Sequence, residues 1–278
     1  MKILYFDDFK LGILKGDTVV DVTGVVQDIP HTGPHDLING LIERFDAYRD
    51  KLKAAVDAGA GVPVSSVRIR PPLPKPGNID CMAVNYMEDG TRDAPAPINA
   101  FQKSASAIIG DGDTMVLPDA PATIFEGEAE IAVVIGKRAS NVAAADALDY
   151  VFGYAVGFDV IRRDVMHDCI ANEHSWDLCK SFTGASPVSA VRPAAEIGHP
   201  KTGEIILEVD GEIRQQGDIS QLIWKTADIV SRLSHYDRIC VGDIIFTGTP
   251  KGPKPVVPGN QLIGRIDSIA MLNITINQ

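Results

Sequence analysis

The chain has 278 residues, of which 45% are hydrophobic, a composition typical of a globular protein with one large domain or a large and a small one. Its 37 acidic residues outnumber the 26 Lys and Arg residues, and the net charge of −11 excludes a general electrostatic attraction to nucleic acid or an anionic membrane. No run is long and apolar enough to cross a bilayer, and the first residues lack the apolar region of a signal peptide. The four cysteines form no C-x-x-C pair, so we expect reduced thiols in a cytoplasmic protein.

Residues 1–70 are predicted to form a small α/β domain without catalytic residues. Three short apolar segments, within residues 2–6, 11–14 and 19–22, are typical of strands. Turn-forming Asp, Lys and Gly residues separate them, so the segments are expected to be neighbouring short strands.

A single amphipathic helix is predicted after these strands. Asp36 is placed to cap its start and Gly59 to end it, and the apolar residues between them recur at helical spacing: Leu37, Leu41, Phe45, Tyr48, Leu52 and Ala55. Prolines exclude a helix in residues 70–78, and we place the boundary with a second domain, residues 71–278, in this segment.

The second domain is predicted to open on a buried strand that ends at Asn85-Tyr86. The next segment, MEDGTRDAPAPIN, is polar and interrupted by Gly90 and prolines, which favours a mobile loop. Further on, we expect two short strands around a turn in residues 108–118 and a helix near residues 143–150.

Two long strands within residues 125–164 are predicted to carry three carboxylates. Side chains two residues apart on a strand point to the same side, so Glu128 and Glu130 point together off an apolar strand. On the second strand, Asp159 shares its face with small residues only: Gly153, Ala155 and Gly157. Buried carboxylates are costly unless a cation neutralises them, and oxygen ligands suit Mg2+, Mn2+ or Ca2+ better than Zn2+. The spacing alone leaves a metal site and an ordinary strand with outward glutamates equally open.

The C-terminal part is predicted to consist of strands around one helix. Asp210-Gly211 between apolar segments indicates a hairpin. An amphipathic helix is expected over residues 219–234, followed by a strand that runs into a sharp turn over residues 242–250 and by the final strands of residues 263–276.

Three motifs in this order resemble those of the fumarylacetoacetate hydrolase family. They are Glu-Ala-Glu at 128–130 before Val-Val-Ile-Gly, Asp159 followed by Arg-Asp at 163–164, and G-D-x-x-x-T-G-T-P at 242–250. The resemblance covers residues 71–278, about three quarters of the chain. It implies an α+β, mainly β fold, a mixed β-sandwich roll after the small N-terminal α/β domain, and a homodimer.

The resemblance also implies roles for individual residues. Glu128, Glu130 and Asp159 would hold a divalent ion, Mg2+ or Mn2+ with Ca2+ possible in principle. Lys180, in WDLCKSF, would lie in the pocket and stabilise a developing oxyanion. The candidate substrate-binding residues are Tyr86, Lys103, Arg163 and Thr249.

Two of these assignments have structural alternatives. Arg163 is equally suited to an ion pair with Glu130 or Asp164, and Thr249 to turn chemistry alone. The glutamine that the family carries after Arg-Asp is Met166 here. Elsewhere, the hairpin matches the family's N-G-x-x-x-Q pattern with Asp in place of Asn.

A metal held by three carboxylates keeps open positions that a 2-oxo acid can fill, and its Lewis acidity stabilises an enolate. We therefore expect a metal-dependent enzyme that acts on a 2-oxo acid or acylpyruvate-like substrate. Hydrolysis of a C–C bond, isomerisation, decarboxylation and dehydration all suit such a site. The alternative is a non-catalytic descendant that binds small carboxylates.

The water-activating pair of the family's hydrolases is missing from the loop after Asn-Tyr. Asp89 stands at the His position and Arg92 at the Glu position. Glu88 or Asp89 is the candidate catalytic base, and two histidines are alternatives: His167 and His174. The missing pair favours isomerase or lyase chemistry, whereas C–C hydrolysis is the majority reaction in the family.

Overall fold

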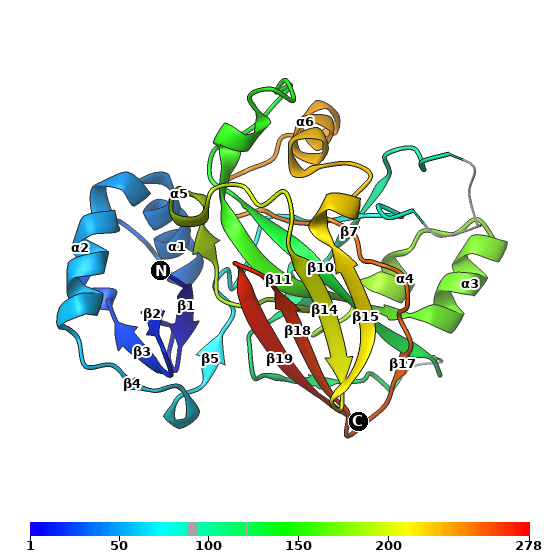
Figure 1. Ribbon diagram of the computed structural model, residues 1–278, viewed down its shortest axis with the longest axis horizontal. Helices are drawn as coiled ribbons and strands as arrows, with labels where there is room; N and C mark the ends of the chain where they lie inside the picture. Colours follow the sequence, from blue (N-terminus) through cyan, green and yellow to red (C-terminus); the bar gives the residue numbers. More distant parts are fainter. Residues whose placement is uncertain (88–93, 120–121) are drawn as a thin grey trace.

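The computed structural model describes residues 1–87, 94–119 and 122–278, and it has a mainly-β α+β fold (Figure 1). The first sheet has the strand order β4-β3-β2-β1-β5. Its strands are β1 (Ile3–Phe6), β2 (Lys10–Lys15), β3 (Thr18–Asp21), β4 (Val62–Pro63) and β5 (Ile69–Arg70). The three predicted N-terminal strands are therefore confirmed.

The predicted single helix is wrong, because the chain forms two helices, α1 (Pro34–Glu43) and α2 (Phe45–Ala58). Arg44 separates them with a non-helical backbone, φ −113° and ψ 15°, and its guanidinium donates a hydrogen bond to the Gly40 carbonyl in the last turn of α1. Gly33, not Asp36, is the N-cap, since Pro34 occupies the first helical position. The break keeps apolar residues of both helices in one core.

The N-terminal sheet is tied to the rest of the chain. The backbone of Ile3 exchanges two hydrogen bonds with Val191, and the core of this region includes Phe152 and Phe246 from later strands. Figure 1 shows the region on one side of the larger β structure. The division of the chain at residue 70 stays a prediction.

The remaining strands form two larger sheets. One has the order β13-β11-β10-β16-β6-β7, with β17 beside β10, and the other has the order β15-β14-β18-β19-β9. The strands of the first are β6 (Ile79–Met82), β7 (Ala100–Lys103), β10 (Phe125–Ile135), β11 (Val151–Arg162), β13 (Arg192–Pro193), β16 (Ile244–Phe246) and β17 (Pro255–Val256). Those of the second are β9 (Thr114–Val116), β14 (Glu204–Val209), β15 (Glu212–Asp218), β18 (Gln261–Ile266) and β19 (Ala270–Asn277).

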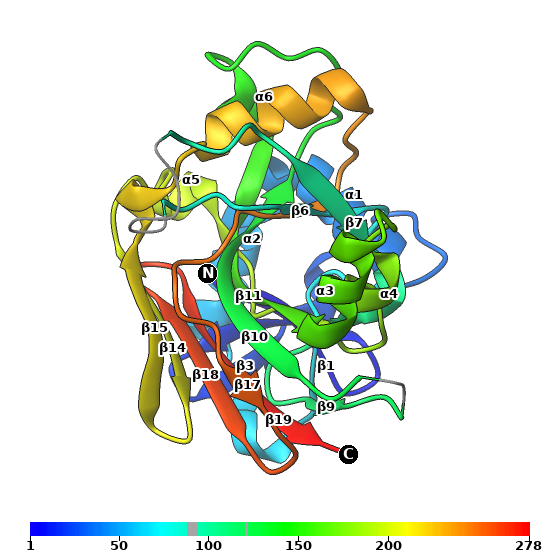
Figure 2. The ribbon, with the colours of Figure 1, turned by 90° about the vertical axis from the view of Figure 1, so that its right-hand side faces the viewer.

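These two sheets pack face to face as a β-sandwich (Figure 2). Most of the predicted bulky face of β11 lies in their common core, where Val156 and Phe158 meet residues of β18 and β19. The exception is Phe152, which packs against Phe45 in the core of the N-terminal region. A Cβ atom at Gly264 of β18 would lie 2.3 Å from the Phe158 ring, so only glycine allows this close approach of the two sheets. Burial of the apolar faces at this interface is the main stabilising contribution.

Several local predictions are confirmed in part. The hairpin between β14 and β15 turns at Asp210 (φ 52°) and Gly211 (φ 81°), the positive values that a tight hairpin turn requires. The expected helix over 219–234 begins later, as α6 (Thr226–Tyr236), and the expected helix near 143–150 is only a 3-10 turn, η4 (Ala147–Tyr150). The two strands expected in 108–118 exist as β8 (Ile108–Ile109) and β9, but each pairs with a different partner.

The other elements are short. They are α3 (Arg163–Ala171), α4 (Asp177–Lys180), α5 (Ala194–Ile197), β12 (Ser186–Pro187) and four 3-10 turns, η1 (Thr23–Val25), η2 (Val64–Ser66), η3 (Ala105–Ala107) and η5 (Ile219–Gln221). Figure 2 shows α3 and α4 beside the ends of β10 and β11. In the part of the chain that the structure describes, every helix is too short or too polar to cross a membrane.

Candidate metal and substrate site

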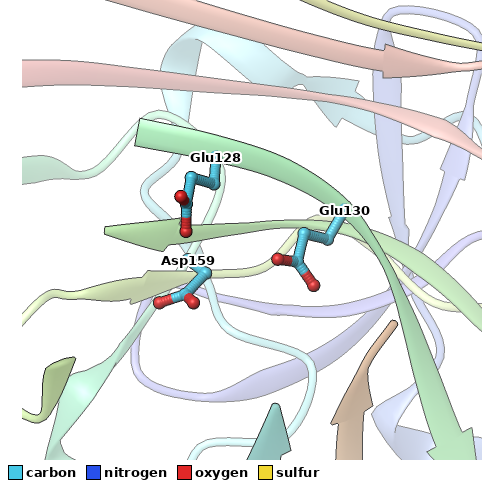
Figure 3. Close-up of side chains that lie close together, drawn as sticks. All are labelled: Glu128, Glu130 and Asp159. Atoms are coloured by element: carbon cyan, nitrogen blue, oxygen red, sulfur yellow. The ribbon is translucent and has the colours of Figure 1, made fainter. Parts of the chain in front are cut away.

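Three buried carboxylates meet where β10 and β11 pair. The antiparallel register places Glu128 directly opposite Asp159 and Glu130 opposite Gly157. Ligand oxygens of the three carboxylates all lie within 4.8 Å of one another, and Figure 3 shows them facing the same space. We call Glu128, Glu130 and Asp159 the carboxylate triad.

The small residues predicted on β11 have a packing role here. A Cβ atom at Gly157 would lie 2.4 Å from the Phe246 ring, so glycine lets this ring fill the space on that face of the strand. Period-2 alternation along β10 then directs Glu128 and Glu130 together to the same side as Asp159. The carboxylates are therefore held by a regular strand pair and not by a loop.

Two lysines donate hydrogen bonds to Asp159, one to each oxygen of its carboxylate. Lys180, at the end of α4, donates hydrogen bonds to Asp159 and, at 2.8 Å, to Glu128. Lys103, at the end of β7, donates to the other Asp159 oxygen at 2.6 Å and to the carbonyls of Val160 and Ala185. All three protons of the Lys103 ammonium thus have protein acceptors.

The charges set the pKa values of these groups. Burial raises the pKa of Asp159, but Lys103 and Lys180 outweigh burial, so this pKa lies below its usual value. Burial lowers the pKa of Lys180, but Asp159 and Glu128 outweigh it, and the pKa is held well above its usual value. Lys180 is therefore an ammonium at neutral pH, suited to donate a hydrogen bond and unsuited to act as a base.

Glu130 is the member of the triad that forms no ion pair with a described lysine or arginine. Its described hydrogen bond comes from the backbone N–H of Gly248, at 2.6 Å. Burial raises the pKa of Glu130 well above its usual value, and the negative charges of Asp159 and Glu128 raise it further. A divalent cation held by the triad would supply the missing positive charge.

Arg163 contacts neither of the partners proposed for it from the sequence. It donates to Glu126 at 2.6 Å and to Glu128 at 3.0 Å, whereas Asp164 accepts hydrogen bonds from Thr123. The ion pair with Glu130 or Asp164 is thus corrected to a pair with Glu126 and Glu128. The reason is that Arg163 begins α3 directly after β11, opposite the first residues of β10.

The turn that follows β16 contacts β10 at the edge of the site. The Thr249 hydroxyl donates to the Ala129 carbonyl at 2.7 Å. The buried amide of Gln215, in β15, donates to Thr249 and to the Pro250 carbonyl and accepts from the Ala129 N–H. No site role was predicted for Gln215, although it is the last residue of the N-G-x-x-x-Q pattern. Its contacts show that it fastens the turn to the carboxylate strand.

A cavity of about 160 Å³ lies beside the triad. Tyr86 lines it, and its hydroxyl is buried without a hydrogen-bond partner in the described part of the molecule. Its wall also contains Arg163, Met166, Lys180, Thr249 and Lys251, together with apolar residues that include Phe101 and Trp176.

The described lining of this cavity includes none of the candidate bases. Glu88 and Asp89 lie outside the described residues. His167 and His174 are exposed and do not line the cavity. The described residues therefore supply three convergent carboxylates and an ammonium group.

Residues 79–277 match the family model described as fumarylacetoacetate (FAA) hydrolase C-terminal. The chain is 36% identical to the mitochondrial oxaloacetate tautomerase FAHD1 of Bos taurus over 205 residues, 72% of this chain and 92% of that protein. It is 30% identical to the maleylpyruvate hydrolase of Aquipseudomonas alcaligenes over 293 residues, 99% of each. The crystal structure of maleylpyruvate hydrolase from Sphingobium sp. SYK-6 with manganese(II) and pyruvate matches with a TM-score of 0.87 and 30% identity, over 100% of both chains.

The match to the family model covers more than half of the chain, and it includes the carboxylate triad and the turn at Thr249. The relatives are named as a tautomerase and as hydrolases, so a catalytic function fits better than the non-catalytic alternative. The chain therefore belongs to the fumarylacetoacetate hydrolase family and is an enzyme of that family.

Proposed function

We propose that this enzyme requires a divalent metal and acts on a 2-oxo acid or an acylpyruvate-like substrate. The observation that carries the proposal is the convergence of the carboxylate triad at the wall of a cavity, beside the ammonium of Lys180. The names of the relatives and the Mn2+ and pyruvate bound in a similar structure support it. We also propose a homodimer, a cytoplasmic location and a domain boundary at residue 70.

The triad would hold Mg2+ or Mn2+, with Ca2+ as a further candidate. Oxygens within 4.8 Å of one another suit an ion with ligand distances of roughly 2.0–2.6 Å. When bound, such an ion supplies Lewis acidity toward the carboxylate and keto oxygens of a 2-oxo acid. Because only an ionised carboxylate coordinates the ion, the raised pKa of Glu130 makes metal binding compete with protonation.

Lys180 is the proposed hydrogen-bond donor to the reacting oxygen. It lines the cavity, and its raised pKa keeps the ammonium charged. Its Nζ would donate a hydrogen bond to the keto oxygen of the substrate as negative charge develops there, which stabilises the enolate form. Removing a proton from carbon is left to a separate base, for which Glu88 and Asp89 are the candidates.

Lys103 and Arg163 are proposed to position carboxylates. Lys103 has three protein acceptors and does not line the cavity, so we assign it to orienting Asp159 and not to substrate binding. Arg163 lines the cavity but donates to Glu126 and Glu128, so it orients Glu128 and adds positive charge at the cavity wall.

Tyr86 and Thr249 are proposed to contact the substrate. The buried hydroxyl of Tyr86 has no described partner, and a substrate oxygen would satisfy it. The hydroxyl of Thr249 already donates to Ala129 and accepts from Gln215, so its backbone N–H is the group suited to a substrate carboxylate.

Keto–enol conversion is the reaction that the described residues support best. It requires a polarised keto oxygen with a hydrogen-bond donor beside it, which a metal held by the triad and Lys180 would supply, and a base that takes the proton from carbon. Hydrolysis of a C–C bond requires in addition a base that activates water. Hydrolysis of an acylpyruvate is the second candidate, because the likeness to maleylpyruvate hydrolase extends over the whole chain.

Steady-state kinetics on oxaloacetate and acetylpyruvate test the proposal. With saturating Mg2+ or Mn2+, we expect tautomerisation or decarboxylation of oxaloacetate to survive Asp89→Asn better than hydrolysis of acetylpyruvate does, and Glu130→Gln to remove both. Efficient hydrolysis without measurable turnover of oxaloacetate would overturn the preference for enolisation. A metal-loaded enzyme inactive on every 2-oxo acid would overturn the proposal itself.

A further inference from the structure

One cation at the cavity has no role in the proposed mechanism. Lys251 lines the cavity, its side chain is exposed, and within the described part of the chain it forms no hydrogen bond or ion pair. Lys180 and Arg163, in contrast, each donate to two carboxylates. Among the described cations of the cavity wall, Lys251 is therefore the one without a protein partner.

The backbone that carries Lys251 is fastened to the triad. Gly248 donates its N–H to Glu130 at 2.6 Å, and the carbonyl of Pro250 accepts from Gln215 at 2.7 Å. Three residues span at most roughly 11 Å, so the Cα of Lys251 cannot lie farther than that from Gly248. A fixed backbone with a long flexible side chain places the ammonium within reach of a small molecule bound at the triad.

The charges of the described residues at the cavity favour a doubly charged ligand. The triad is balanced by Arg163, Lys180 and Lys251, and a divalent ion held by the triad would add two positive charges. Two further charged groups that contact this set, Glu126 and Lys103, cancel each other. A 2-oxo acid with one carboxylate would leave one positive charge uncompensated, whereas a 2-oxo dicarboxylate would neutralise both.

We propose that Lys251 determines specificity by binding the second carboxylate of a 2-oxo dicarboxylic acid, such as an acylpyruvate whose acyl group ends in a carboxylate. The inference rests on the proposed function, which places the 2-oxo acid group of the substrate at the triad. The ammonium forms a charge-assisted hydrogen bond with the distant carboxylate. The rest of the acyl chain lies along the apolar part of the wall, which includes Met166 and Trp176.

Two ligands of equal chain length that differ at the second carboxylate measure the contribution of this group to binding. Calorimetric titration of the Mn2+-loaded enzyme with 2-oxopentanedioate and with 2-oxopentanoate measures binding without relying on turnover. For Lys251→Met we expect the Kd of the dicarboxylate to rise about fivefold to tenfold and the Kd of the monocarboxylate to change less than about twofold. Lys251→Glu should increase the first effect, and added salt should reduce the preference of the unaltered enzyme.

Lys254 provides a matched control. It lies three residues farther along, is exposed, and does not line the cavity, so Lys254→Met makes the same change in net charge at nearly the same place. We expect it to leave both Kd values within about twofold of the unaltered enzyme. An equal effect of Lys251→Met and Lys254→Met would overturn the inference, because the effect would then belong to net charge alone.

Kinetics separate this inference from the function on which it rests. We expect Lys251→Met to raise the KM for 2,4-dioxoheptanedioate and to leave the KM for 2,4-dioxoheptanoate nearly unchanged. If both substrates bind and react but are affected equally, Lys251 has no part in specificity and the proposed function stands. If the metal-loaded enzyme neither binds nor converts any of these 2-oxo acids, both proposals are refuted.

Discussion

Two groups of buried carboxylates in this molecule are held by partners that differ in charge. The triad faces a cavity, and two of its members accept hydrogen bonds from ammonium groups. Asp80, in β6, and Asp243, just before β16, are also buried. Their described hydrogen bonds come from neutral donors: the side chain of Gln102 for Asp80, and Asn78 and the backbone of Cys240 for Asp243.

The pKa values follow this difference. The pKa of Asp159 lies below its usual value because Lys103 and Lys180 outweigh burial. Burial raises the pKa of Asp80 to about 6, since the hydrogen bond from Gln102 offsets it only in part. Ammonium groups thus keep a buried carboxylate ionised and able to bind a metal, whereas neutral donors leave it close to taking up a proton. Buried carboxylates alone do not identify a metal site; the convergence of three of them beside an ammonium group does.

The largest expected effect is a loss of activity when a carboxylate of the triad is changed, compared with a change at Asp80. Glu130→Gln removes a proposed metal ligand, and we expect kcat/KM on the preferred 2-oxo acid to fall at least about 1000-fold. Asp80→Asn replaces a carboxylate of the other group and should leave kcat/KM within about twofold. Steady-state kinetics at saturating Mn2+ compare the two variants, and comparable losses in both would contradict the assignment of the site to the triad.

The second prediction concerns stability at the triad. Lys103→Met leaves the buried carboxylate of Asp159 with one ammonium partner fewer, and we expect the free energy of unfolding in urea to fall by about 3 kcal/mol or more. Mn2+ should restore part of this loss, because the ion supplies positive charge at the same carboxylate. Lys53→Met, an exposed change on α2, is the control and should have little effect. Loss of stability that Mn2+ leaves untouched would count against a metal at Asp159.

The third prediction is a pH dependence at the other carboxylates. The pKa of Asp80 in the folded state is about 6 and its usual value is 3.8, so the folded state holds this proton more tightly than the unfolded state. Stability is therefore lost as the pH rises from about 4 to about 6, by up to about 3 kcal/mol. Asp80→Asn removes this loss, so the variant should gain stability relative to the unaltered protein across that interval and keep the gain at higher pH.

Urea unfolding of both proteins at several pH values measures this gain. Asp50→Asn, at an exposed position on α2, serves as the matched control and should show no such trend. A gain from Asp80→Asn that is the same at pH 4 and pH 7 would show that the proton on Asp80 is not its cause.

The smallest effect concerns the neutral residue that holds the turn at the cavity. Gln215→Leu leaves the Ala129 N–H and the Pro250 carbonyl without their partner, so the turn carrying Thr249 should loosen. We expect KM to rise about fivefold to tenfold with a smaller change in kcat. Gln216→Leu, at the exposed neighbouring position, should change neither constant. A fall in kcat with KM unchanged would assign Gln215 to the chemical step.

The alternation of residues along two strands predicted which carboxylates point together, whereas the family resemblance, and not the spacing, predicted that they hold a metal. Period 2 determines which side Glu128, Glu130 and Asp159 face, and this local rule holds in β10 and β11. The register that sets Glu128 opposite Asp159 depends on the pairing of the whole strands, which the pattern alone does not specify. The hairpin at Asp210-Gly211 was predictable for the same reason, since its turn chemistry is local.

Contacts between distant segments could not be predicted from the sequence. Lys103 and Gln215 reach β10 and β11 from strands far along the chain, so no spacing rule reveals that one holds Asp159 and the other holds the turn. The break at Arg44 was missed because helical spacing continues across it. Local patterns thus predicted where the carboxylates lie, whereas tertiary packing determines what holds them.

Binding of Mn2+ tests the central claim most directly. Titration of the metal-free protein, followed by the electron paramagnetic resonance signal of free Mn2+, counts the ions bound per chain. We predict one ion per chain, retained in Asp80→Asn and lost in Glu130→Gln over the same concentration range. Equal Mn2+ binding by Glu130→Gln and the unaltered protein would contradict the claim that the triad holds the metal.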